Sequence, residues 1–214
     1  MQIKKETLIW ASLIVLVIIV SYFILFYKPI NTNSNEKIYS FSDTYFNYSQ
    51  SRTIPKYEMS FNSTNGSLEI YNLAFQSRNF LNYTTKIYGL LFIPKSDKPV
   101  PGLVLLPGGS VPKENEAGLA RIIANLGYAV LTIDQRGIGQ TGGYYLGFQD
   151  DYKVFASGNE PVQHLSVYDA LASYDVLKQI KGVDKDNMAI AGESMGGRYA
   201  IIAAAIDKRL KGAP

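Results

Sequence analysis

A short glycine-rich segment near residue 194 joins a predicted strand directly to a predicted helix. The segment fits the pattern G-x-S-x-G and reads Gly192-Glu193-Ser194-Met195-Gly196-Gly197. An apolar run, 187–191, precedes it, and an Ala-rich run, 195–206, follows it. The serine must therefore stand on a tight strand-to-helix turn. Such a turn needs its glycines, because a side chain at Gly192, Gly196 or Gly197 would force the strand and the helix apart.

The position of the serine suggests a nucleophile. A helix that begins directly after Ser194 directs its N-terminal N–H groups, and the positive end of its dipole, at any negative charge formed there. The N–H of Met195 is the expected first donor to such an oxyanion. The same string also occurs in ordinary Gly/Ser-rich turns, and the flanking strand and helix favour the nucleophile.

The rest of the chain alternates apolar strands with helices. Strands are predicted at 68–75, 86–93, 102–106, 129–133 and 187–191, and helices at 114–126, 161–180 and 195–206. This alternation predicts an α/β fold with a mostly parallel sheet flanked by helices. The first two strands form an antiparallel start, with a turn near Asn82.

From about Leu68 onward the chain resembles the α/β-hydrolase superfamily. The run GLVLLPGGS at 102–110 looks like the family's oxyanion strand, with Pro107-Gly108 where His-Gly is more common, and this implies that Gly109 supplies a second oxyanion N–H. Residues 134–141 resemble the structural D-x-R-G-x-G-x-S loop. Residues 183–187 resemble the turn before the nucleophile strand in dienelactone-hydrolase and prolyl-oligopeptidase-like groups. The resemblance implies a serine esterase or peptidase that acts on a small-molecule or peptide ester or amide.

The base of a catalytic triad is not evident. The chain order in this fold is serine, acid, then histidine, but the only histidine, His164, precedes Ser194. We expect His164 to lie near a helix start rather than to act as the base, and Asp169 and Asp175 to be solvated or capping. Asp207 is expected at the end of the helix that follows the serine. The chain is therefore expected to be the N-terminal portion of a larger hydrolase, C-terminally incomplete and inactive alone.

Two alternatives stay open. One is a non-catalytic, membrane-tethered interaction protein that keeps the scaffold. The other, less favoured, is a minimal enzyme that uses His164.

The N-terminus carries a membrane signal. Residues 8–27 form an uncharged apolar run of roughly 20 residues, which is long enough for a transmembrane helix through the lipid bilayer. Lys4 and Lys5 precede it, which predicts a cytoplasmic segment at 1–7 and an extracytoplasmic remainder. Residues 28–55 read as a polar tether and 56–214 as the partial hydrolase domain. Four N-x-[ST] sequons, at Asn47, Asn62, Asn65 and Asn82, agree with export.

Composition narrows the remaining possibilities. The chain has no cysteine, so disulfides and thiolate metal sites are excluded. A net charge of +3 without a basic block argues against nucleic acid as a partner. The glycines at 137–142 fit G-x-G-x-x-G, but the residues after them are a poor helix start, so no nucleotide cofactor is expected. No metal is expected either, and the oligomeric state is left open.

Overall fold

A six-stranded mixed sheet forms the centre of the fold. The computed structural model describes residues 54–207 and 209–210. The strands run in the order β1-β2-β3-β5-β4-β6. Their bounds are β1 Tyr57–Asn65, β2 Leu68–Gln76, β3 Lys86–Pro94, β4 Val100–Leu106, β5 Ala129–Ile133 and β6 Val183–Gly192.

The sheet is mixed rather than mostly parallel. β1, β2 and β3 form an antiparallel meander, and β3 also pairs antiparallel with β5. Only β4 pairs in parallel, with β5 on one side and β6 on the other. β1, β2 and β3 follow one another closely in the chain, and short connections favour antiparallel pairs.

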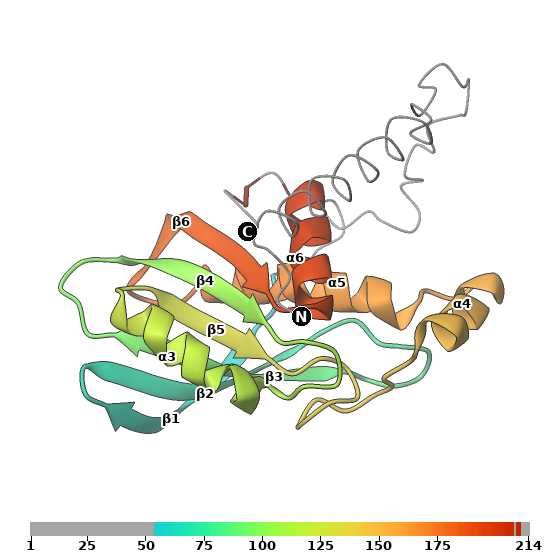
Figure 1. Cartoon of the computed structure of the whole chain (residues 1–214), viewed down its shortest axis with the longest axis horizontal. Coiled ribbons are helices and arrows are strands. Elements are labelled where there is room, and N and C mark those ends of the chain that lie inside the picture. Colours follow the sequence, from blue (N-terminus) through green and yellow to red (C-terminus); the bar gives the residue numbers. More distant parts are fainter. Residues whose placement is uncertain (1–53, 208, 211–214) are drawn as a thin grey trace, which may run out of the picture. The chain divides into compact units, whose positions relative to one another are not determined.

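Helices cover both faces of the sheet (Figure 1). α3, Ala117–Asn125, packs on one face after a short 3-10 turn, η1, at Lys113–Glu116. α5, Val162–Leu177, and α6, Met195–Ile206, pack on the other. α4, Phe148–Ala156, lies in the long connection between β5 and α5. This layered α/β architecture agrees with the predicted hydrolase-type fold.

The core is largest on the face that α5 and α6 cover. Nearly all of α5 is buried, and its apolar residues pack against β4, β6 and α6. The smaller cluster beneath α3 depends on three alanines, Ala117, Ala120 and Ala124. α6 and the strands β4 and β6 therefore pack on a common core, which holds the carboxyl ends of those strands in place.

The predicted transmembrane helix at 8–27 lies outside the described residues. Within 54–207 and 209–210, no helix combines the length and the apolar character needed to cross a bilayer.

Candidate active site

The turn at Ser194 has the backbone of a strained elbow. Ser194 has φ 50° and ψ −112°, an unusual conformation for a residue with a side chain. Such conformations cost about 1–3 kcal/mol and persist only where surrounding structure enforces them. The residue stands between the last residue of β6 and the first of α6, as the sequence predicts, and it is exposed.

The glycines around the serine are required by close packing of the backbone. A Cβ on Gly192 would lie 2.4 Å from the carbonyl carbon of Gly196, and one on Gly197 would lie 2.9 Å from the carbonyl oxygen of Gly192. A Cβ on Gly196 would lie 2.3 Å from the carbonyl oxygen of Leu106. These distances are far below van der Waals contact, so any side chain at these three positions would open the turn.

The predicted oxyanion loop lies beside this turn. In the parallel register of β4 and β6, Leu106 is the partner of Gly192, so both loops leave neighbouring strand ends. A Cβ on Gly108 would lie 3.9 Å from the Cβ of Ser194, and one on Gly109 would lie 2.9 Å from the Cε of Met195. The structure therefore brings Gly109, Met195 and Ser194 together.

Among the residues that the structure describes, no backbone hydrogen bond at the start of α6 uses the N–H of Met195. The N–H groups of Gly196 and Gly197 donate to the carbonyl oxygen of Glu193, and that of Arg198 donates to the carbonyl oxygen of Ser194. Since the first N–H groups of a helix have no partner within it, the Met195 N–H is suited to bind an anion.

A residue that sequence reasoning missed holds the oxyanion loop. The side-chain amide of Gln135, which is buried, donates to the carbonyl oxygen of Pro107 at 2.6 Å and to that of Gly108 at 3.4 Å. Gln135 occupies the variable second position of the D-x-R-G loop, so the motif gave no signal for it. Tyr145 was also missed, and its hydroxyl oxygen would lie 3.0 Å from a Cβ on Gly109.

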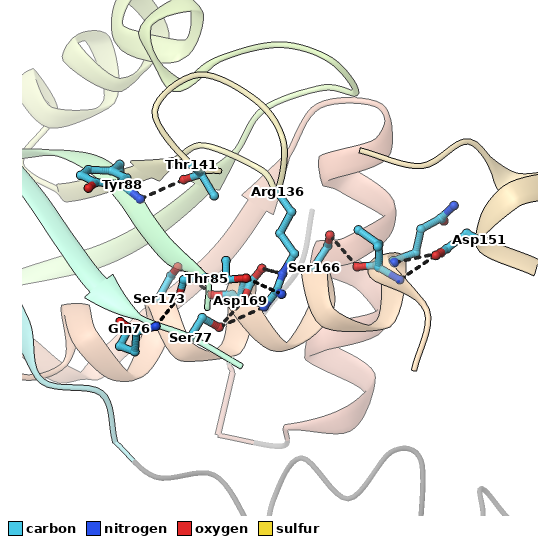
Figure 2. Close-up of polar contacts among 12 residues, drawn as sticks. Gln76, Ser77, Thr85, Tyr88, Arg136, Thr141, Asp151, Ser166, Asp169 and Ser173 are labelled. Carbon is cyan, nitrogen blue, oxygen red and sulfur yellow. Dashed lines mark hydrogen bonds and ion pairs between the residues drawn. The ribbon is translucent and has the colours of Figure 1, made fainter. Parts of the chain in front are cut away.

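A buried ion pair fixes the D-x-R-G loop to α5. The guanidinium of Arg136 donates to both carboxylate oxygens of Asp169, at 2.7 and 2.8 Å, and to the hydroxyl of Thr85 at 3.1 Å (Figure 2). Ser77 also donates to Asp169. The expectation that Asp169 is solvated or capping was wrong, because its partner comes from a loop 33 residues away.

Asp175 is likewise buried rather than solvated. Its carboxylate accepts from the guanidinium of Arg209 at 3.2 Å. A second buried acid, Asp134, accepts from the ammonium of Lys113 at 2.8 Å, and Lys113 is itself almost fully buried. The charged residues of this region thus form the framework of the site rather than its reactive surface.

Two carboxyl groups lie together next to the elbow. Burial raises the pKa of Glu116, and the nearby carboxyl of Glu193, the residue before Ser194, raises it further. Glu116 is the last residue of η1 and is buried, whereas Glu193 is exposed. Their proximity links the ionisation of Glu116 to the turn that carries Ser194.

His164 lies near the start of α5, as expected. Its ring meets that of Phe155 edge-on, with 6.5 Å between the centroids, and burial lowers its pKa. Asp207 directly follows the last residue of α6, also as expected.

Comparison with known proteins identifies similar chains. The family model described as acetyl xylan esterase (AXE1) matches residues 26–214. The solved acetyl xylan esterase from Paenibacillus sp. R4 is 26% identical, with a TM-score of 0.66 over 87% of this chain and 60% of that chain. Acetyl xylan esterase 1 from Thermoanaerobacterium sp. JW/SL YS485 is 21% identical, with a TM-score of 0.64 over 75% of this chain and 52% of that chain, a likeness of fold.

The match to one curated relative covers a smaller share of both chains. The 2,6-dihydropseudooxynicotine hydrolase of Paenarthrobacter nicotinovorans is 27% identical over 118 residues, which are 55% of this chain and 28% of that protein. The chain thus spans 52% and 60% of the two solved esterases and 28% of this relative.

Proposed function

The chain belongs to the acetyl xylan esterase (AXE1) family, and from this membership we propose that Ser194 is the nucleophile of an ester hydrolase. The Ser194 oxygen attacks the carbonyl carbon of a carboxylic ester, the alcohol leaves, and water then releases the acyl group from the serine. The names of the two similar solved esterases point to an acetyl ester as the substrate.

The observation that carries the proposal is the strained conformation of Ser194 beside the Gly109 loop. A φ of 50° on a serine is retained where it exposes the hydroxyl above a helix N-terminus. The N–H groups of Met195 and Gly109 are the proposed donors to the oxyanion of the tetrahedral intermediate. Each such donor contributes on the order of 10²–10³ to the rate in a well-studied serine protease.

The proposal also concerns the general base of the catalytic triad. The histidine of this fold follows the serine in chain order, whereas the only histidine here, His164, precedes it. We propose that these 214 residues alone lack the base and react slowly.

A serine-reactive fluorophosphonate tests the nucleophile. Even without a triad base, oxyanion donors and binding retain about 10³–10⁴-fold catalysis in serine proteases. We expect Ser194 of the full chain to be labelled on the order of 10²-fold faster or more than Ser157, an exposed serine after α4. Peptide mass spectrometry gives both rates in one sample, and Ser194→Ala is the control. Equal labelling of the two serines contradicts the nucleophile, and labelling as fast as a complete serine hydrolase contradicts the missing base.

We also propose that residues 8–27 anchor the protein in the membrane and that the hydrolase unit lies outside the cytoplasm. The uncharged apolar run and the preceding Lys4 and Lys5 support this orientation. Protease added to intact cells should remove the hydrolase unit. Full protection of that unit under conditions that digest a known surface protein contradicts the orientation.

A further inference from the structure

A pocket of about 640 Å³ lies between α4, α5 and α6, in a size range typical of small-molecule sites. Its aromatic wall comes from α4, as Phe148, Tyr152 and Phe155, which are 66%, 68% and 46% exposed. Arg198 and Tyr199 of α6 form the opposite wall, and Gln163 and His164 of α5 complete the lining. Exposed aromatic rings around a pocket of this size suit a flat, apolar ring.

The pocket contains one unusual cation. The guanidinium of Arg198 lies over the ring of Phe148, at 4.8 Å from the centroid, and donates to the side-chain oxygen of Gln163. Its Nε is buried without a hydrogen-bond partner, and Arg198 forms no ion pair with any carboxylate of residues 54–207 and 209–210. Partly buried cations normally have an anionic partner. Among the described residues, Arg198 has none.

The other polar groups of the pocket do not supply that anion. The two carboxylate oxygens of Asp151 accept from the N–H groups of Val162 and Gln163, at 2.6 and 3.0 Å, and so cap α5. Burial lowers the pKa of His164, which favours its uncharged imidazole. Arg198 is therefore the cation that an incoming ligand meets.

The pocket is close to the predicted nucleophile. The N–H of Arg198 donates to the carbonyl oxygen of Ser194 at 3.1 Å, so the arginine lies one helical turn beyond the serine. The pocket and the elbow therefore both use the first turns of α6.

We propose that this pocket binds the alcohol part of the ester, and that this alcohol carries an apolar ring and an anionic group that pairs with Arg198. The assignment of the ring to the alcohol rests on the proposed function of Ser194. The aromatic wall binds the ring, and the guanidinium, which is suited to bidentate pairing with carboxylate, binds the anion.

Binding to a non-reacting variant tests the pocket separately from the chemistry. The probes are 4-(hydroxymethyl)benzoate and its uncharged analogue 4-(hydroxymethyl)benzamide, titrated calorimetrically into the full chain carrying Ser194→Ala. We expect the benzoate to bind at least about tenfold tighter than the benzamide, as for a charge-assisted pair. Adding Arg198→Gln should reduce this preference to less than about twofold. The matched control is Arg121→Gln, since Arg121 also lies over an aromatic ring, Phe92, but on the opposite face of the sheet; it should keep the preference.

A variant at an exposed position keeps the test decisive if Arg198→Gln does not fold. Phe148 is 66% exposed, so Phe148→Ala should fold, and we expect it to weaken both probes by a similar factor. Equal affinity for benzoate and benzamide, or a preference that persists in Arg198→Gln, overturns the proposal. With Ser194 intact, the benzoate should also slow fluorophosphonate labelling of Ser194. Absence of labelling tells against the nucleophile alone, whereas labelling that the benzoate does not slow overturns the placement of the ring.

Discussion

The backbone N–H of Glu193 donates to the carbonyl oxygen of Leu106 over 3.0 Å, which ties the nucleophile turn to the end of the neighbouring strand β4. The same oxygen occupies the space that a side chain at Gly196 would need. The start of α6 and the end of β4 are therefore in backbone contact, and the oxyanion loop leaves from this point of contact.

Gly196→Ala should damage the fold as well as the site. Its Cβ would lie 2.3 Å from the carbonyl oxygen of Leu106 and 2.5 Å from that of Pro107, and neither backbone group can move cheaply. We expect the free energy of unfolding to fall by about 3 kcal/mol, at the upper end of overpacking costs. The control is Gly118→Ala in α3, where a Cβ meets nothing within 4 Å and helix propensity predicts a gain of up to about 1 kcal/mol. Urea unfolding of both variants measures the contrast, and equal effects would contradict the tight turn.

Gln135→Leu should loosen the oxyanion loop. The substitution keeps the volume but leaves the buried carbonyl oxygen of Pro107 without its donor at 2.6 Å. We expect a loss of about 1–3 kcal/mol of stability and faster hydrogen exchange at residues 108–110 than in the parent chain. Gln149→Leu on the exposed side of α4 is the matched control. Unchanged exchange in the Gln135 variant would show that the amide does not hold the loop.

Asp169→Asn should test the buried pair between the D-x-R-G loop and α5. The side chains of Arg136 and Asp169 are 1% and 3% exposed, so removing one charge leaves the other buried and uncompensated. The expected cost is about 3–5 kcal/mol in denaturant unfolding. Asp150→Asn removes one partner of an exposed pair with Lys153 and should change the midpoint little. Similar midpoints for the two variants would contradict a structural role for Asp169.

Local pattern was sufficient to predict most of the framework. The strands that begin at Leu68, Lys86 and Ala129 lie where apolar runs predict them, and the elbow lies between its predicted strand and helix. These features depend on near neighbours in sequence. A G-x-S-x-G string between an apolar strand and an Ala-rich helix already contains the steric reason for its shape.

Features that depend on distant partners were not predictable in this way. On α3 the apolar side chains of Leu119 and Ile122 are 46% and 62% exposed. The alanines of α3 face the sheet instead, because small residues let a helix approach it closely. β1 was missed because its residues are mostly polar and exposed at the sheet edge, and α4 because it is short and its aromatic rings are exposed.

The same limit applies to the site. The pairing of Asp169 with Arg136 and the bond from Gln135 to Pro107 join residues about 30 positions apart. A charged residue on a helix suggests a solvated side chain, since the sequence does not show which loop will fold against it. Sequence motifs point to Ser194 and Gly109. The residues that hold these two in place can be identified only from the three-dimensional structure.

Glu116 should make stability depend on pH. Burial and the adjacent carboxyl of Glu193 raise its pKa in the folded state above the ordinary value of 4.5. The protonated carboxyl therefore stabilises the fold below pH 4.5, and this contribution is lost as the pH rises through the raised folded pKa. The glutamine of Glu116→Gln stays neutral at every pH. We therefore expect the free energy of unfolding of this variant to decrease less than that of the parent chain as the pH rises from 4.5. At pH 8 the variant should be the more stable of the two. Glu193→Gln should flatten the profile in the same direction, because it removes the neighbouring charge. Urea unfolding across this pH range provides the measurement, and parallel profiles for the parent and Glu116→Gln would show that the two carboxyl groups are not coupled to folding.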